Sequence, residues 1–136
     1  MTKTDLCKMA IEAMNNSYSP YSSYKVGAAL LCDDGAVYTG CNIENASFSP
    51  TVCAERVAIF KAISENKYNF SMIAVAGGKD GEINGIFPPC GVCRQVIAEF
   101  CKPDFEILLV KSENEFDTIK LKELLPYSFL PNNLEK

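Results

Sequence analysis

Two segments of this chain place cysteines where helices are expected to begin. Cys90 and Cys93 lie three positions apart in PPCGVC, directly after two prolines, and Cys53 lies in TVCAER. Positions i and i+3 of a helix share a face, so the two sulfur atoms of PPCGVC can reach one point. If the two helices lie side by side on one face of a sheet, Cys53 supplies a third sulfur at that point.

Three such thiols predict a zinc site with an open position. A helix N-terminus favours the thiolate form, and zinc accepts thiolate ligands in tetrahedral geometry. The chain contains no histidine that could add a nitrogen ligand. Structural zinc sites normally have four protein ligands, whereas catalytic sites keep one position for water. Three sulfur ligands therefore indicate a catalytic metal site.

Two charged residues follow Cys53 in the first turn of its helix. Glu55 can accept a proton from a water on the metal and pass it on, which is general acid–base catalysis. Three thiolates leave zinc with surplus negative charge, and Arg56 lies three positions after Cys53. We expect the guanidinium group of Arg56 to donate hydrogen bonds to the zinc-bound sulfurs. The alternative is a surface arginine on an exposed helix face.

The other cysteines are expected to be small buried hydrophobic residues, because each lies in an apolar stretch. They are Cys7, Cys32, Cys41 and Cys101. Seven cysteines are an odd number, which favours thiols and metal ligands over disulfides in a cytoplasmic protein.

The order of helical and strand patterns predicts an α/β protein with one domain over residues 1–136. A helix near the N-terminus, with Thr4 as its N-cap, is followed by a hairpin that turns at Asp34-Gly35. The helix of CAERVAIFKAISEN, capped by Ser49 or Thr51, precedes the strand SMIAVAGG. The helix of CGVCRQVIAEFC, the strands FEILLV and FDTIKL, and a helical turn in KELLP follow. We predict a three-layer α/β/α sandwich with a five-stranded mixed sheet and an antiparallel final strand pair.

Charge and hydrophobicity exclude several classes of partner. The net charge is −4 and the 13 Lys and Arg residues are scattered, so no basic patch for a nucleic acid is expected. No apolar run approaches the ~20 residues of a membrane span, and MTKTDLCKMA lacks the apolar region of a secretory signal. We therefore expect a cytoplasmic protein with no nucleic-acid or membrane partner.

The order of motifs along the chain resembles one enzyme family. C-A-E followed by P-C-x-x-C is the three-cysteine form of the zinc-deaminase signature. Together with YSSYKVGAALL, GCNIENASF and LLPYSF, these motifs cover most of the chain. The chain resembles a small, homotetrameric, zinc-dependent cytidine deaminase. This resemblance implies hydrolysis of cytidine and deoxycytidine to uridine and deoxyuridine, with release of ammonia, in pyrimidine salvage.

The resemblance also implies roles for individual residues. One zinc ion per subunit would be bound by the three cysteines described above, and Glu55 would carry protons. Asn42 and Glu44 would hold the ribose hydroxyls of the nucleoside. Tyr24 would lie beside the substrate, and the backbone of Ala54 would hold the pyrimidine edge. Phe129 would pack on the base from a neighbouring subunit, so active sites would be shared between subunits of the homotetramer.

Three aromatic residues depart from the pattern of that family. Tyr24 stands where the family usually has phenylalanine, so it carries an additional hydroxyl group. Phe48 stands where many relatives have tyrosine, so the hydrogen bond of that hydroxyl to the nucleoside is lost. Tyr127 is bulky where a small residue is common. All three changes concern the substrate and leave the metal chemistry as predicted.

Other functions remain as alternatives. A structural zinc module would need a fourth ligand, such as Cys41 or Cys101, and would have no catalytic activity. A thioredoxin-like redox protein would use C-G-V-C alone, but that fold carries its motif after an early strand. Within the deaminases, the alternatives are enzymes that act on polynucleotides, on the antibiotic blasticidin S, or on guanine or adenine.

Overall fold

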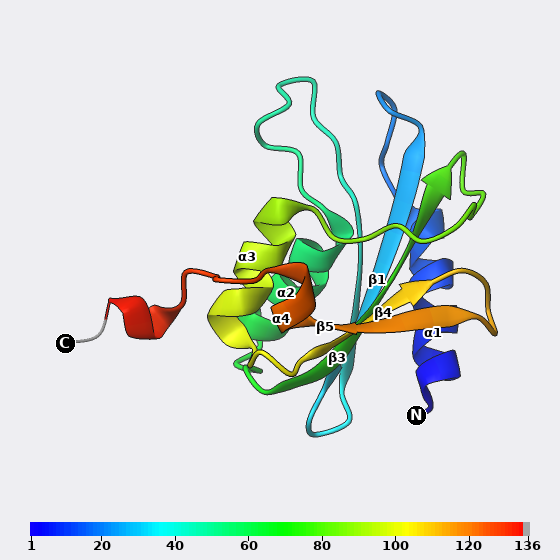
Figure 1. The fold of residues 1–136 in the computed structure, drawn as a ribbon. Helices are drawn as coiled ribbons and strands as arrows, with labels where there is room; N and C mark the ends of the chain where they lie inside the picture. The colour runs from blue at the N-terminus through cyan, green and yellow to red at the C-terminus, as the bar shows by residue number, and fades with distance from the viewer. Residues whose placement is uncertain (135–136) are drawn as a thin grey trace.

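A five-stranded mixed sheet forms the centre of the computed structural model, which describes residues 1–134 (Figure 1). Along the chain, the strands are β1 (Tyr24–Cys32), β2 (Val37–Cys41), β3 (Phe70–Lys79), β4 (Glu106–Val110) and β5 (Phe116–Lys120). In space their order is β2-β1-β3-β4-β5. Strands β3 and β4 are parallel, and the other three pairs are antiparallel. The predicted mixed sheet and antiparallel final pair are confirmed.

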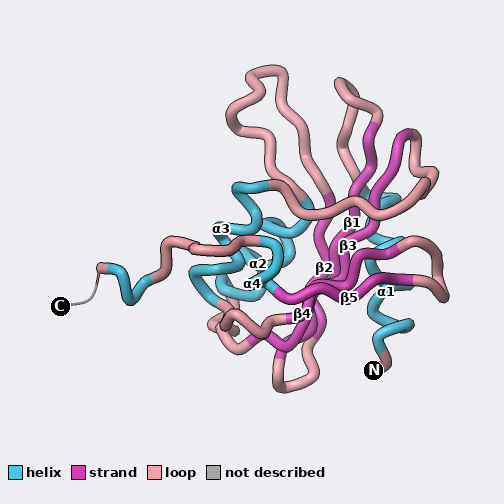
Figure 2. Tube along the Cα trace, in the orientation of Figure 1, coloured by secondary structure: helices cyan, strands magenta, loops and turns pink. Residues whose placement is uncertain are grey.

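Helices cover both faces of this sheet, as Figure 2 shows. The helices are α1 (Lys3–Ala13), α2 (Ala54–Ser64), α3 (Gly91–Phe100) and the short α4 (Leu121–Leu124). Helix α1 packs on one face, and α2 and α3 pack on the other, so the predicted three-layer α/β/α sandwich is confirmed. Among residues 1–134, no helix has both the length and the apolar character that crossing a membrane requires.

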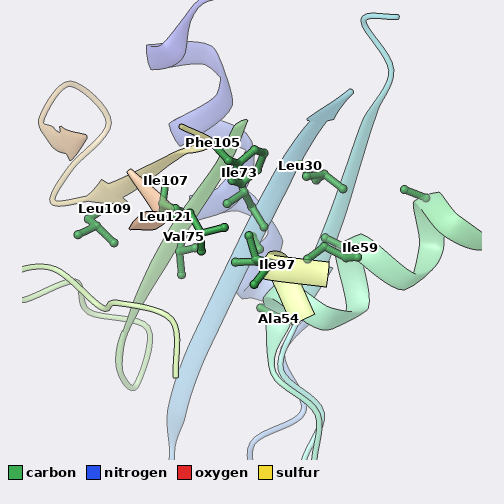
Figure 3. Close-up of a cluster of buried hydrophobic side chains, with 14 of the residues drawn as sticks. Leu30, Ala54, Ile59, Ile73, Val75, Ile97, Phe105, Ile107, Leu109 and Leu121 are labelled. Carbon is green, nitrogen blue, oxygen red and sulfur yellow. The ribbon is translucent and has the colours of Figure 1, made fainter. Parts of the chain in front are cut away.

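Alternating side chains of the strands enter two separate cores, one on each face of the sheet. In β1, Ala29 points to the core under α1, whereas Leu30 points to the core under α2 and α3. Ile59 of α2 and Ile97 of α3 are almost completely buried in this second core, together with Ile73 of β3 (Figure 3). Burying each of these side chains contributes about 1.5–3 kcal/mol, which fixes α2 and α3 against the sheet.

The N-cap of the first helix lies two residues before the predicted one. Thr2, not Thr4, is the N-cap of α1. The Thr2 hydroxyl accepts a hydrogen bond from the amide of Asp5 at 3.0 Å, and the Asp5 carboxylate accepts one from the amide of Thr2 at 3.0 Å. This reciprocal pair needs an acidic or amide side chain three residues after the cap, which Thr2 has and Thr4 lacks.

The predicted caps of the second helix, Ser49 and Thr51, are also wrong. Cys53 is the N-cap of α2, and its side chain makes no capping hydrogen bond. The chain stays extended up to this point because Ile43 and Val52 form an antiparallel bridge, with two backbone hydrogen bonds of 3.0 Å. The helix therefore begins only after the bridge, and the sulfur of its cap is left available for another partner.

A glycine sets the distance between β2 and the start of α2. A Cβ atom on Gly40 would lie 2.4 Å from the carbonyl oxygen of Ala54 and 2.6 Å from the amide nitrogen of Ala58. Real Cβ atoms do not approach backbone this closely, so only glycine allows the first turn of α2 to pack directly on the strand. This contact holds the helix start that carries Cys53.

We expect Gly40→Ala to lower the free energy of unfolding by about 1–3 kcal/mol, because the added methyl group must push strand and helix apart. The measurement is urea denaturation followed by circular dichroism. Gly91→Ala is the control, since a Cβ atom there meets no atom within 4 Å. Equal stability of the two variants would contradict the proposed packing role of Gly40.

Candidate functional site

Three cysteine sulfurs meet where α2 and α3 begin. Cys53 and Cys90 are the N-caps of the two helices, and Cys93 lies in the first turn of α3. Their sulfur atoms all lie within 4.8 Å of one another, and those of Cys53 and Cys90 are 3.6 Å apart. The predicted convergence of the two helix starts is confirmed.

The geometry of this cluster fits a tetrahedral metal. Zinc–sulfur bonds of about 2.3 Å in tetrahedral geometry place sulfur atoms about 3.8 Å apart, close to the separation of Cys53 and Cys90. Cys93 is fully buried, Cys53 is half-buried and Cys90 is exposed, so the cluster lies at the edge of the core. Neither Cys41 nor Cys101 belongs to the group, which contains three ligand atoms among the described residues. The cluster therefore leaves one tetrahedral position to a ligand from outside the group.

Charge around the cluster favours a thiolate. A hydrogen bond with Cys93, followed by one from Arg56, lowers the pKa of Cys53 below its usual range. The Nη2 atom of Arg56 lies 3.5 Å from the sulfur of Cys53. The Nε atom of Arg56 is also buried and, within residues 1–134, has no hydrogen-bond partner. The guanidinium group thus lies against the sulfur cluster and is not on an exposed helix face.

Glu55 is a buried carboxylic acid in the same helical turn as Arg56. Its side chain is only 3% exposed. Burial raises the pKa of Glu55 to about 7, and the negative charge of Cys53 acts in the same direction. A group with this pKa is populated in both its protonated and its deprotonated form near neutral pH, as proton transfer in either direction requires.

Asn42 is placed near the metal cluster by the bridge between Ile43 and Val52, the residues next to Asn42 and Cys53 in the chain. It is almost buried, and its Oδ1 accepts hydrogen bonds from the amide of Val26 at 2.9 Å and from the hydroxyl of Ser17. Its Nδ2 donates to a backbone carbonyl at 2.8 Å. Among residues 1–134, the second N–H of this Nδ2 has no acceptor, so it can donate to a bound molecule.

Glu44 directly follows Ile43 of this bridge, and its side chain contacts the loop before β1. Its carboxylate accepts hydrogen bonds from the amides of Tyr21 at 3.0 Å and Ser22 at 3.1 Å, and from the Ser22 hydroxyl. The Ser22 hydroxyl is the main reason why the pKa of Glu44 is lowered. Glu44 also lines a hollow of about 310 Å³ together with Tyr21, Phe48 and other residues of the two loops. A charged carboxylate therefore faces an open space.

The remaining predicted substrate residues differ in how far they are exposed to solvent. Ala54 is fully buried directly after Cys53. Tyr24 is 43% exposed at the start of β1, with its ring 6.0 Å from that of Phe87. Phe129 lies in the C-terminal segment, which runs away from the body of the molecule (Figure 1). It is 59% exposed, so a single chain does not enclose it.

Comparison with known proteins places the chain in a family. A family model described as the cytidine and deoxycytidylate deaminase zinc-binding region matches residues 1–108. The chain belongs to this deaminase family. The matched region contains Cys53, Cys90 and Cys93, and it identifies zinc as the metal of the cluster.

Individual members of the family are similar over most of their length. A cytidine deaminase from Halalkalibacterium halodurans is 44% identical over 134 residues, which cover 98% of each chain. One from Sporosarcina psychrophila is 43% identical and covers 90% of this chain and 88% of its own. The crystal structure of cytidine deaminase from Burkholderia pseudomallei superposes with a TM-score of 0.87 at 42% identity, over 95% of this chain and 100% of the other. The predicted family and fold are confirmed.

Sequence reasoning missed the residues that hold the predicted site in place. Ser17 and Ser22 bind Asn42 and Glu44 over separations of 25 and 22 residues. Serines in a polar loop carry no local signal for such contacts, because the partners meet only once the sheet has formed.

Proposed function

We propose that the chain catalyses the hydrolytic deamination of cytidine and deoxycytidine to uridine and deoxyuridine, with release of ammonia. One catalytic domain over residues 1–136 would carry this activity, although the last two residues lie outside the described part. The observation that carries the proposal is the group of three thiols with one open position beside a buried carboxylic acid. Such an enzyme would act in pyrimidine salvage in the cytoplasm.

Glu55 is the proton carrier of the proposed reaction. Zinc, when bound, supplies a polarised water that can attack an electrophilic carbon near neutral pH. Glu55 takes one proton from this water and delivers it to N3 of the cytosine ring, which makes C4 electrophilic. It then moves the second proton to the amino group, which leaves C4 as ammonia while oxygen takes its place. Its burial excludes bulk water from these transfers.

Asn42, Glu44, Tyr24 and Ala54 are proposed to bind the nucleoside. The free N–H of Asn42 and the carboxylate of Glu44 offer one donor and one strong acceptor, which suits a sugar hydroxyl. The backbone of Ala54, between Cys53 and Glu55, would hold the pyrimidine edge. The ring of Tyr24 would lie beside the substrate.

Phe129 is proposed to complete the active site of a neighbouring subunit in a homotetramer. The projecting C-terminal segment supports this assignment, because it leaves the ring of Phe129 59% exposed and able to contact a surface outside its own chain. Phe48, which is 76% exposed at the rim of the hollow beside Glu44, is a second aromatic group available for such contacts.

We expect Arg56→Ala to lower kcat/KM for cytidine by about 10–100-fold, as the loss of a group that tunes metal ligands typically does. Without the guanidinium charge, a water bound to zinc would hold its proton more tightly. The acidic limb of the pH profile should therefore move to higher pH. Steady-state kinetics from pH 5 to 9 and zinc titration measure both effects. Unchanged zinc affinity together with an unchanged profile would remove Arg56 from the site.

The proposed substrate class is tested by ultraviolet absorbance. Purified protein is mixed with cytidine, deoxycytidine and blasticidin S, each with and without a chelator. We expect turnover of both nucleosides that the chelator abolishes, and no turnover of the antibiotic. Turnover of blasticidin S alone would contradict the proposal, and so would turnover that survives complete removal of zinc.

A further inference from the structure

Two side chains of α3 connect the metal-binding loop with the end of α4 and with the C-terminal segment that follows it, residues 125–134. Arg94 donates from Nε to the carbonyl of Pro89 at 2.7 Å and from Nη1 to the carbonyl of Leu124 at 2.8 Å. Gln95 donates from Nε2 to the carbonyl of Phe129 at 2.8 Å. Together these bonds join the stretch 89–95 to a second stretch, 124–129, which lies about 30 residues further along the chain.

Arg94 contacts both the metal-binding loop and the end of α4. It directly follows Cys93, and its first acceptor, Pro89, directly precedes Cys90. Its second acceptor, Leu124, is the last residue of α4, whose carbonyl has no partner within its own helix. A planar guanidinium group can reach two carbonyls at once, which a lysine ammonium group cannot do with the same geometry.

Gln95 acts further along the C-terminal segment. Its acceptor is the backbone of Phe129, the residue proposed to reach a neighbouring active site. The side chain of Phe129 remains 59% exposed, so this bond holds the backbone while the ring stays free to contact another surface. Arg94 thus holds the end of α4, directly before the C-terminal segment, and Gln95 holds that segment at Phe129.

We propose that Arg94 and Gln95 are positioning residues that hold the C-terminal segment at a fixed place relative to the zinc site. Because Arg94 bonds to both, a fixed conformation of the loop before Cys90 also restricts the motion of α4 and the residues after it. Through Gln95, Phe129 is presented to the neighbouring subunit. The consequence for substrate binding rests on the proposed function, whereas the structural link does not.

The first test compares two substitutions on α3 in the zinc-loaded full chain, each of which converts an amide side chain to a carboxylate or the reverse. Gln95→Glu keeps the shape of the side chain but removes its N–H donor. Glu99→Gln is the control, an exposed position one turn further along. We expect Gln95→Glu to speed hydrogen exchange of residues 125–134 by roughly fivefold or more, since one hydrogen bond is lost and a carboxylate then faces a carbonyl.

The kinetics of the same variants separate positioning from general stability. Gln95→Glu is expected to raise KM for cytidine by roughly fivefold, with kcat within about twofold of the parent and one zinc ion per chain. Glu99→Gln should change neither the exchange rates nor KM. Identical exchange rates and KM values in the two variants would overturn the proposal.

The second test uses Arg94→Lys, which keeps the positive charge and removes the two-carbonyl geometry. In the parent, chelation of zinc should speed exchange in residues 125–134 as well as at the amides of Ile86 and Phe87, which precede the two prolines of the metal-binding loop. In Arg94→Lys, exchange in 125–134 should be fast with and without zinc. If zinc removal leaves 125–134 unchanged in the parent, the link through Arg94 is wrong. If the parent fails to deaminate cytidine but these exchange effects appear, the link stands and the proposed function falls.

Discussion

Glu55→Gln is expected to lower kcat for cytidine by about 10²–10⁴-fold while the protein still binds one zinc ion per chain. The amide has nearly the same shape as the carboxylic acid, but it cannot accept and return a proton. Glu55 is almost completely buried beside the sulfur cluster, so bulk water does not replace it. Ammonia release and elemental analysis on the same preparation measure the two quantities.

The control for Glu55→Gln is the same substitution at exposed Glu99, which should keep full activity. Near-parental activity of Glu55→Gln would end its assignment as the proton carrier. Loss of zinc from this variant would show that the carboxylate is itself a metal ligand. That result would contradict the proposed site, in which the fourth position holds water.

Cys90→Ala is expected to abolish zinc binding and cytidine turnover, and to lower Tm by roughly 10–20 °C. A metal present at 1,000 times its Kd contributes about 4 kcal/mol to stability, and for a domain of this size that free energy corresponds to such a shift. Cys90 is exposed, so removing its sulfur costs little buried area. The loss therefore comes from the metal bonds that tie the start of α3 to the start of α2. Scanning calorimetry and metal analysis provide the measurement.

Chelation and a second cysteine supply the controls for Cys90→Ala. The parent protein with zinc removed should melt at the same temperature as the variant. Cys101→Ala, at the other end of α3, should keep its zinc and its activity. A zinc-replete, active Cys90→Ala protein would contradict the ligand set. Loss of zinc in Cys101→Ala would favour a structural site with four protein ligands.

The sequence predicted the layers of the fold and the metal cluster because both depend on strong local patterns. Strands β1, β3 and β4 are largely apolar runs whose side chains alternate between the two faces, and the cysteines mark two helix starts. Convergence of Cys53 with Cys90 and Cys93 then follows from two crossover helices on one face of the sheet.

The details that could not be predicted depend on contacts between distant segments. The bridge between Ile43 and Val52 moves the start of α2 past Ser49 and Thr51, and no local propensity encodes it. Nor does the spacing of Arg94 in CRQ indicate that it reaches Leu124, 30 residues further on. Such contacts arise when packing brings polar groups to carbonyls that local structure leaves without partners.

The open coordination position is the centre of this account, and X-ray absorption at the zinc edge tests it directly. For the zinc-loaded protein without substrate, we expect three sulfur ligands near about 2.3 Å and one oxygen near about 2.0 Å. Because the chain has no histidine, the ligand near about 2.0 Å cannot be an imidazole nitrogen of this protein. A coordination shell of four sulfur atoms would contradict a catalytic zinc site in this protein.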